Sequence, residues 1–120
     1  MSTPDLAPAL LVVEDDRALS ALLVELLTGE GYRVDTAYDG QQGMHRGLTG
    51  NYDALVVDRS LPDGDGAAFI ADLRARGVST PAVLMSGTPL TAPDARTRFL
   101  QKPFSIDALP MLLATMVSRR

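Results

Sequence analysis

Apolar residues along this chain follow two spacings, and the changes between them predict alternating strands and helices. Continuous or alternating apolar runs predict five strands, at residues 9–13, 33–37, 53–57, 81–85 and 98–101. Apolar residues three and four positions apart predict helices at residues 17–28, 40–48, 67–76 and 106–117. Strands that alternate with helices are typical of right-handed βα units, so we predict an α/β fold with a parallel sheet.

Glycine and proline mark the expected interruptions of this pattern. Gly43 and Gly47 lie inside the predicted helix 40–48, and we expect them to break it. A turn rich in proline and glycine follows the third strand at residues 61–66, and residues 86–93 are predicted to be mostly loop.

Pro110 leaves two starting points open for the last helix. If Ser105 is the N-cap, Pro110 lies inside the helix and removes a hydrogen bond. If Asp107 is the N-cap, Pro110 lies in the first turn, where proline is tolerated. We prefer the second interpretation, with a turn at residues 105–106.

Length and composition favour one domain that folds without disulfides or structural metal ions. The 120 residues, 46% of them apolar, suffice for a single core, which we place at residues 9–120 after a flexible leader at residues 1–8. The absence of cysteine excludes disulfides and thiolate metal sites, and the single histidine, His45, disfavours a histidine zinc site.

Hydropathy and charge narrow the location and the partners. No apolar run approaches the roughly 20 residues that cross a bilayer, and no basic signal segment begins the chain, so we expect a cytoplasmic protein with no membrane contact. Fifteen acidic residues against eleven basic ones give a net charge of −4, which argues against direct nucleic-acid binding by this chain.

Polar residues of complementary chemistry follow four of the five predicted strands. They are Glu14, Asp15 and Asp16 after the first strand, Asp58 after the third, Ser86 after the fourth and Lys102, the only lysine, after the fifth. Because the carboxyl ends of parallel strands share one edge of a sheet, we expect these side chains to converge there.

Clustered carboxylates repel each other unless a cation neutralises them, and carboxylate oxygens suit Mg²⁺ or Mn²⁺. The hydroxyl of Ser86 and the ammonium of Lys102 are suited to phosphate oxygens. Asp58, at a strand end before a pliant turn, is the best-placed nucleophile for an acyl phosphate.

Three motifs in order carry a family resemblance: Leu11-Val12-Val13-Glu14-Asp15-Asp16, the D-x-x-x-P-x-x-x-G run from Asp58 to Gly66, and Lys102-Pro103-Phe104, with Ser86 between the last two. Together they resemble the receiver domain of two-component response regulators. The first half is most similar to receivers of winged-helix transcription regulators.

The resemblance implies a flavodoxin-like (βα)5 doubly wound five-stranded parallel sheet. It implies that a sensor histidine kinase or phosphotransfer protein phosphorylates Asp58. Glu14, Asp15, Asp58 and the backbone carbonyl of Ser60 match the Mg²⁺ site, and Ser86 and Lys102 match the phosphate-contacting pair. Phe99 stands at the position where the family usually has a switch Tyr or Phe. The peptide bond between Lys102 and Pro103 is expected to be cis.

One departure concerns the fourth helix of the family. Ser86 and Lys102 are sixteen positions apart, about one and a half helical turns fewer than is usual in the family. We therefore predict one or two turns of helix at residues 91–97, or none. In winged-helix regulators the fourth helix, fifth strand and fifth helix commonly form the active dimer. A shortened helix would therefore reduce the surface available for a phosphorylation-dependent homodimer.

Each motif also has an ordinary interpretation when taken alone. Asp16 is expected to cap a helix, an isolated Asp58 is most often a turn residue, and Phe99 alone favours core packing. Two competing functions stay open: an interaction module that works without phosphate, and an aspartate-based phosphohydrolase. The second is disfavoured because Ser60 stands where such enzymes have an acid, so we expect slow self-dephosphorylation at most and no turnover enzyme.

Overall fold

The structure is a computed structural model that describes residues 7–89 and 94–117. Five parallel strands form one sheet in the order β2-β1-β3-β6-β7. Their bounds are β1 Ala9–Val13, β2 Arg33–Ala37, β3 Ala54–Asp58, β6 Ala82–Ser86 and β7 Thr97–Gln101. The predicted parallel α/β sheet is confirmed, and each strand agrees with its predicted range to within one residue.

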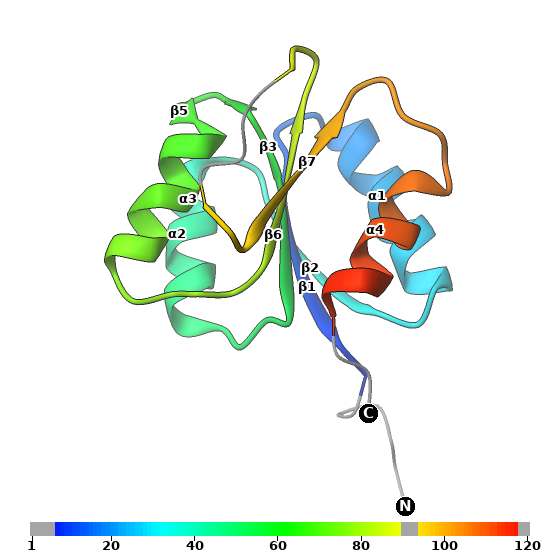
Figure 1. Cartoon of the computed structure of the whole chain (residues 1–120), viewed down its shortest axis with the longest axis horizontal. Helices are drawn as coiled ribbons and strands as arrows, with labels where there is room; N and C mark the ends of the chain where they lie inside the picture. Colours follow the sequence, from blue (N-terminus) through cyan, green and yellow to red (C-terminus); the bar gives the residue numbers. More distant parts are fainter. Residues whose placement is uncertain (1–6, 90–93, 118–120) are drawn as a thin grey trace, which may run out of the picture.

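Helices cover both faces of this sheet. They are α1 Arg17–Gly29, α2 Gly40–Thr49, α3 Gly66–Ala75 and α4 Ala108–Met116. In Figure 1, α1 and α4 lie on one side of the sheet and α2 and α3 on the other. This doubly wound arrangement places the loops that follow the strands at one end of the molecule.

Side chains that alternate along each strand divide the core into two clusters. Leu10 and Val12 of β1 pack on the side of α1 and α4, whereas Leu11 and Val13 pack on the side of α3. Because β1, β3 and β6 are completely buried, their residues are apolar, except for Asp58 and Ser86 at the ends of β3 and β6.

The expectation that glycine breaks the second helix is wrong. Gly43 and Gly47 are buried inside a continuous α2. A Cβ on Gly43 would meet Phe69 and Val13 at 3.0–3.2 Å, and one on Gly47 would meet Leu73 at 3.1 Å. These glycines therefore allow α2 to approach β1 and α3 closely, which offsets their poor helix propensity.

The chain between β3 and α3 is more regular than the predicted turn. It forms a small antiparallel hairpin from β4 Ser60–Leu61 and β5 Gly64–Asp65. The carboxylate of Asp63 accepts hydrogen bonds from the backbone N–H groups of Gly40 and Gln41, at 2.7 and 2.9 Å. The hairpin thereby caps the start of α2.

The last helix starts as the second interpretation predicted. Asp107 is its N-cap, without a side-chain cap bond, and Pro110 lies in its first turn. The N–H of Ala108 donates to the carbonyl of Ser105 at 3.0 Å and closes the expected turn.

No helix is present between β6 and β7 in the part of this connection that the structure describes. Residues 94–96 form a turn, and the rest of the predicted helix, through residue 93, lies outside the described residues. Arg74 of α3 ties the end of this connection to the segment before β6, because it binds Asp94 and Thr97 as well as the carbonyls of Val78 and Thr80.

The predicted leader lies mostly outside the described residues, which begin at Ala7. The carbonyl of Pro8 already accepts a hydrogen bond from the N–H of Arg33, so contacts with the sheet include this residue. No helix within residues 7–89 and 94–117 has the length and apolar character needed to cross a bilayer.

Candidate functional site

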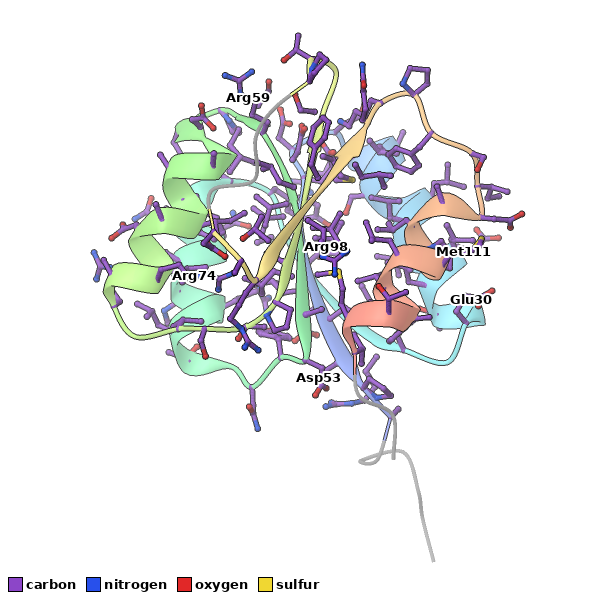
Figure 2. The ribbon with its side chains drawn as sticks, viewed as in Figure 1. Glu30, Asp53, Arg59, Arg74, Arg98 and Met111 are labelled. Atoms are coloured by element: carbon purple, nitrogen blue, oxygen red, sulfur yellow. The ribbon has the colours of Figure 1, made fainter. Side chains whose placement is uncertain are left out.

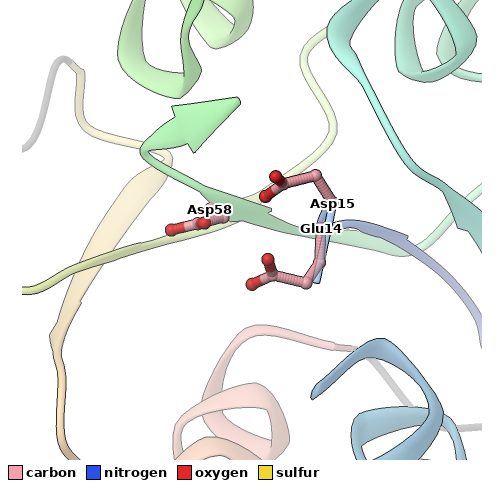
Figure 3. A group of neighbouring side chains, drawn as sticks. All are labelled: Glu14, Asp15 and Asp58. Atoms are coloured by element: carbon pink, nitrogen blue, oxygen red, sulfur yellow. The ribbon is translucent and has the colours of Figure 1, made fainter. Parts of the chain in front are cut away.

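An acidic pocket lies at the carboxyl ends of β1 and β3. Carboxylate oxygens of Glu14, Asp15 and Asp58 all lie within 4.8 Å of one another. Figure 3 shows the three side chains at the ends of these two strands. Glu14 and Asp58 are buried, at 1% and 7% exposed, whereas Asp15 is exposed.

Strand pairing brings the acids together. Val13 of β1 lies opposite Val57 of β3, so the next residues, Glu14 and Asp58, emerge beside each other. Asp16 then caps α1, where its Oδ1 accepts from the N–H of Leu19 at 3.0 Å. The predicted capping role of Asp16 is confirmed, and this cap turns the chain away from the pocket.

Lys102 is the cation of this pocket. Its Nζ donates to Asp58 Oδ1 at 3.1 Å and lies 3.5 Å from Glu14 Oε1. The N–H of Lys102 donates to the carbonyl of Ser86 at 2.7 Å, which extends the β6–β7 pairing. The peptide bond between Lys102 and Pro103 is cis, as the resemblance implies.

Burial makes the carboxyl group of Glu14 hard to ionise. Desolvation raises its pKa from 4.5 to about 7, against a hydrogen bond from the N–H of Asp16 that lowers it. Within this net shift of the pKa, the negative charge of Asp58 acts in the same direction as burial, and Lys102 acts against it. Additional positive charge in the pocket would therefore favour the carboxylate form of Glu14.

The pKa of Lys102 is also raised, but for an ammonium group this favours the charged form. Burial works to lower the pKa of its ammonium group, but the hydrogen bond and the charge of Asp58, together with Glu14, raise it above the usual value. Lys102 is therefore a permanent cation at neutral pH.

The donor set fits a hard divalent cation. Glu14 Oε1 is buried, and the ammonium group of Lys102 pairs with it at 3.5 Å. The three carboxylates face one another, and the single ammonium group of Lys102 balances only part of their charge. The cluster therefore keeps an excess of negative charge. Carboxylate oxygens of this kind suit Mg²⁺ or Mn²⁺.

The other predicted site residues lie nearby but do not join this cluster. The hydroxyl of Ser86 contacts Thr88, at 3.1 Å from its N and 3.3 Å from its Oγ1. Ser60 is an exposed residue of β4, and no described contact joins its carbonyl to the acids. Phe99 is half-buried on β7 opposite Leu84 and belongs to neither core cluster.

Sequence reasoning missed two residues at the rim. Arg59 Nη1 donates to Thr88 Oγ1 at 3.0 Å, and Arg59 Nε lies 3.5 Å from Asp65 Oδ2. Thr88 lies in a loop without a sequence signal. Arg59 lies at a variable position of the D-x-x-x-P-x-x-x-G run, although its place directly after Asp58 was a usable hint.

Gly66 completes the motif for a steric reason. A Cβ at this position would overlap the backbone carbonyl of Asp58, because the N–H of Gly66 donates to the neighbouring carbonyl of Arg59. The close approach of α3 to the end of β3 therefore requires glycine and fixes the backbone of Asp58.

Comparison with known proteins identifies the family. The model of the response regulator receiver domain matches residues 10–114, so the chain belongs to the response regulator receiver domain family.

Several of its curated relatives are transcriptional regulatory proteins. DltR of Streptococcus agalactiae is 34% identical over 110 residues, which cover 83% of this chain and 47% of that protein. TcrA of Mycobacterium tuberculosis is 40% identical over 111 residues, which cover 83% of this chain and 42% of that protein. The chain thus spans about half the length of the curated relatives it matches.

Solved receiver domains share the fold. The receiver domain of the Francisella response regulator 1452 has a TM-score of 0.84 at 27% identity, over 91% of this chain and 95% of that one. The response regulator TrrA of Thermotoga maritima, solved in complex with Mg²⁺ and BeF, has a TM-score of 0.81 at 25% identity, over 92% and 99%.

Proposed function

We propose that this chain is the phosphoacceptor switch of a two-component system and that Asp58 accepts the phosphoryl group. The observation that carries the proposal is the pairing of Asp58 Oδ1 with Lys102 Nζ at 3.1 Å inside a pocket with two further acids. The donor would be a sensor histidine kinase or a phosphotransfer protein, in keeping with the family.

The transfer needs positioning and charge balance more than covalent work by other residues. A carboxylate oxygen of Asp58 attacks the phosphorus of a phosphohistidine. The P–N bond breaks, its electron pair returns to the imidazole nitrogen, and an acyl phosphate forms on Asp58. Lys102, already 3.1 Å from Asp58, is placed to pair with a phosphoryl oxygen.

Glu14, Asp15, Asp58 and the backbone carbonyl of Ser60 would hold the cation, Mg²⁺ or alternatively Mn²⁺. When bound, such an ion supplies positive charge to the carboxylates and to the phosphoryl oxygens. The burial of Glu14 and Asp58, which share one ammonium group, supports this assignment. TrrA, a structural relative, was solved with Mg²⁺ and BeF.

The output would be a change of surface. The phosphoryl group carries about two negative charges in place of the one on the Asp58 carboxylate, and the hydroxyl of Ser86 would turn toward it. Phe99, half-buried on the edge strand β7, would move inward behind the loop after β6. A downstream protein, an output domain or a second copy of the chain would then bind the altered surface.

The test is phosphorylation by a small acyl-phosphate donor with Mg²⁺, followed by intact-mass spectrometry. The chain should gain one phosphoryl group, and Asp58→Asn should gain none. Asp72→Asn, a matched change at an exposed residue of α3, should be labelled like the wild type. An unlabelled wild type, or full labelling of Asp58→Asn, contradicts the proposal.

A second candidate function is an interaction module that works without phosphate. The missing helix in the described part of the β6–β7 connection favours it, because that helix belongs to the usual dimer surface of the family. In this case Asp58→Ala would leave partner binding unchanged, whereas the switch requires binding to differ with and without the acyl-phosphate donor.

A further inference from the structure

The hydroxyl of Ser86 is held by Thr88, on the side of the loop after β6. Ser86 is only 3% exposed, its Oγ accepts from the N–H of Thr88 at 3.1 Å, and the two hydroxyl oxygens lie 3.3 Å apart. Either hydroxyl can be the donor of this bond. In the arrangement where Ser86 is the donor, its single proton must leave Thr88 Oγ1 before it can reach a phosphoryl oxygen.

Thr88 is in turn held by Arg59, the residue directly after Asp58. Arg59 Nη1 donates to Thr88 Oγ1 at 3.0 Å, and Arg59 Nε pairs with Asp65 Oδ2 at 3.5 Å. Asp65 is itself anchored, because its Oδ1 accepts from the N–H of Ala67 at the start of α3. Figure 2 shows Arg59 at the end of the sheet where β6 runs into this loop.

The guanidinium group therefore bridges two elements. Its planar fork reaches a hydroxyl on the loop after β6 and a carboxylate that caps α3. A lysine has a single ammonium group and cannot reproduce both contacts in this geometry.

We propose that Arg59 and Thr88 form a latch that keeps the Ser86 hydroxyl turned away from Asp58 in the unphosphorylated chain. Arg59 is thus a positioning residue that sets how readily the site accepts a phosphoryl group. This inference rests on the proposed function. Opening the latch should favour the arrangement in which Ser86 faces the phosphoryl group.

The experiment titrates beryllofluoride, a phosphoryl mimic, into the Mg²⁺-loaded chain by calorimetry. Thr88→Val removes the hydroxyl at nearly constant volume, and Arg59→Lys keeps the charge. Each variant should bind beryllofluoride about threefold tighter, the size of one partly exposed hydrogen bond. The double variant should bind no tighter than either single variant, because both changes open the same latch.

Three measurements separate a latch from a general structural effect. The Mg²⁺ affinity without beryllofluoride should be unchanged in every variant, because neither residue touches Glu14, Asp15 or Asp58 in the described contacts. Thr88→Ser, which keeps the hydroxyl, should bind beryllofluoride like the wild type. Matched changes elsewhere, Arg76→Lys on α3 and Thr115→Val on α4, should leave beryllofluoride affinity unaltered.

Unchanged or weaker beryllofluoride binding in Thr88→Val and Arg59→Lys overturns the latch, and so do additive effects in the double variant. A wild type that binds no beryllofluoride at all overturns both the latch and the proposed function. If the wild type binds beryllofluoride and the variants bind it with the same affinity, only the latch is overturned.

Discussion

Lys102 and Asp58 are 44 positions apart in the chain, yet Lys102 Nζ lies 3.1 Å from Asp58 Oδ1. Glu14 Oε1 lies 3.5 Å from the same Nζ, so one ammonium group is shared by two buried carboxyl groups. Because burial strengthens each of these interactions, the pocket is sensitive to any change of its charge.

Replacing the lysine should therefore slow phosphorylation. Lys102→Met removes the cation next to Asp58, and we expect the rate with a small acyl-phosphate donor to fall by about 100- to 1,000-fold, as for other groups that stabilise developing charge. The measurement is the rate of mass gain under saturating Mg²⁺. Arg98→Met, an exposed change on β7, is the matched control and should keep the wild-type rate. A wild-type rate for Lys102→Met would contradict this role.

The raised pKa of Glu14 makes the metal-free chain less stable as the pH rises. The folded chain binds this proton up to about pH 7, whereas the unfolded chain releases it near pH 4.5. The stabilisation is complete below pH 4.5 and is lost as the pH rises through 7, by about 1–3 kcal/mol. Urea unfolding at pH 5 and pH 8 should show this loss in the wild type and a smaller one in Glu14→Gln.

Mg²⁺ should act against the same proton. A cation that uses the Glu14 carboxylate competes with protonation, so the Mg²⁺ affinity should increase between pH 5 and pH 8. Calorimetry at several pH values, in buffers of different ionisation enthalpy, measures the proton released. An affinity that does not depend on pH would exclude Glu14 from the metal site.

Gly66→Ala should disturb the site through the backbone. The added Cβ would overlap the carbonyl of Asp58, so β3 and α3 must separate. We expect a loss of about 1–3 kcal/mol in the free energy of unfolding, together with slower phosphorylation of Asp58. Gly29→Ala is the control, since its Cβ meets no atom within 4 Å, and this change at the last residue of α1 should not destabilise the chain.

Arg74→Met should destabilise the fold without touching the pocket. Arg74 donates to the carbonyls of Val78 and Thr80 and pairs with Asp94, and the part-buried carbonyls would lose their donor. We expect the free energy of unfolding to fall by about 1–3 kcal/mol. Arg76→Met, which loses only an exposed pair with Asp72, should change it little. An unchanged Mg²⁺ affinity in Arg74→Met would separate this role from the site.

The sequence alone determined the framework and the position of the acids. Strands buried on both faces are mostly apolar, so the apolar runs at residues 9–13 and 81–85 were sufficient to predict two of them. The positions of Glu14 and Asp58 followed, because the ends of parallel strands share one edge of the sheet. Local chemistry also located the start of α4, because proline is tolerated only in the first turn of a helix.

Only the tertiary structure decided what depends on neighbours distant in the sequence. Helix propensity predicted a break at Gly43, but the close packing of Phe69 and Val13 makes glycine necessary there. The hydroxyl of Ser86 contacts Thr88, and Arg59 reaches Thr88 across 29 positions of the chain. Spacing and propensity describe a residue and its near neighbours in the chain, whereas these contacts arise only once the sheet has brought separate loops together.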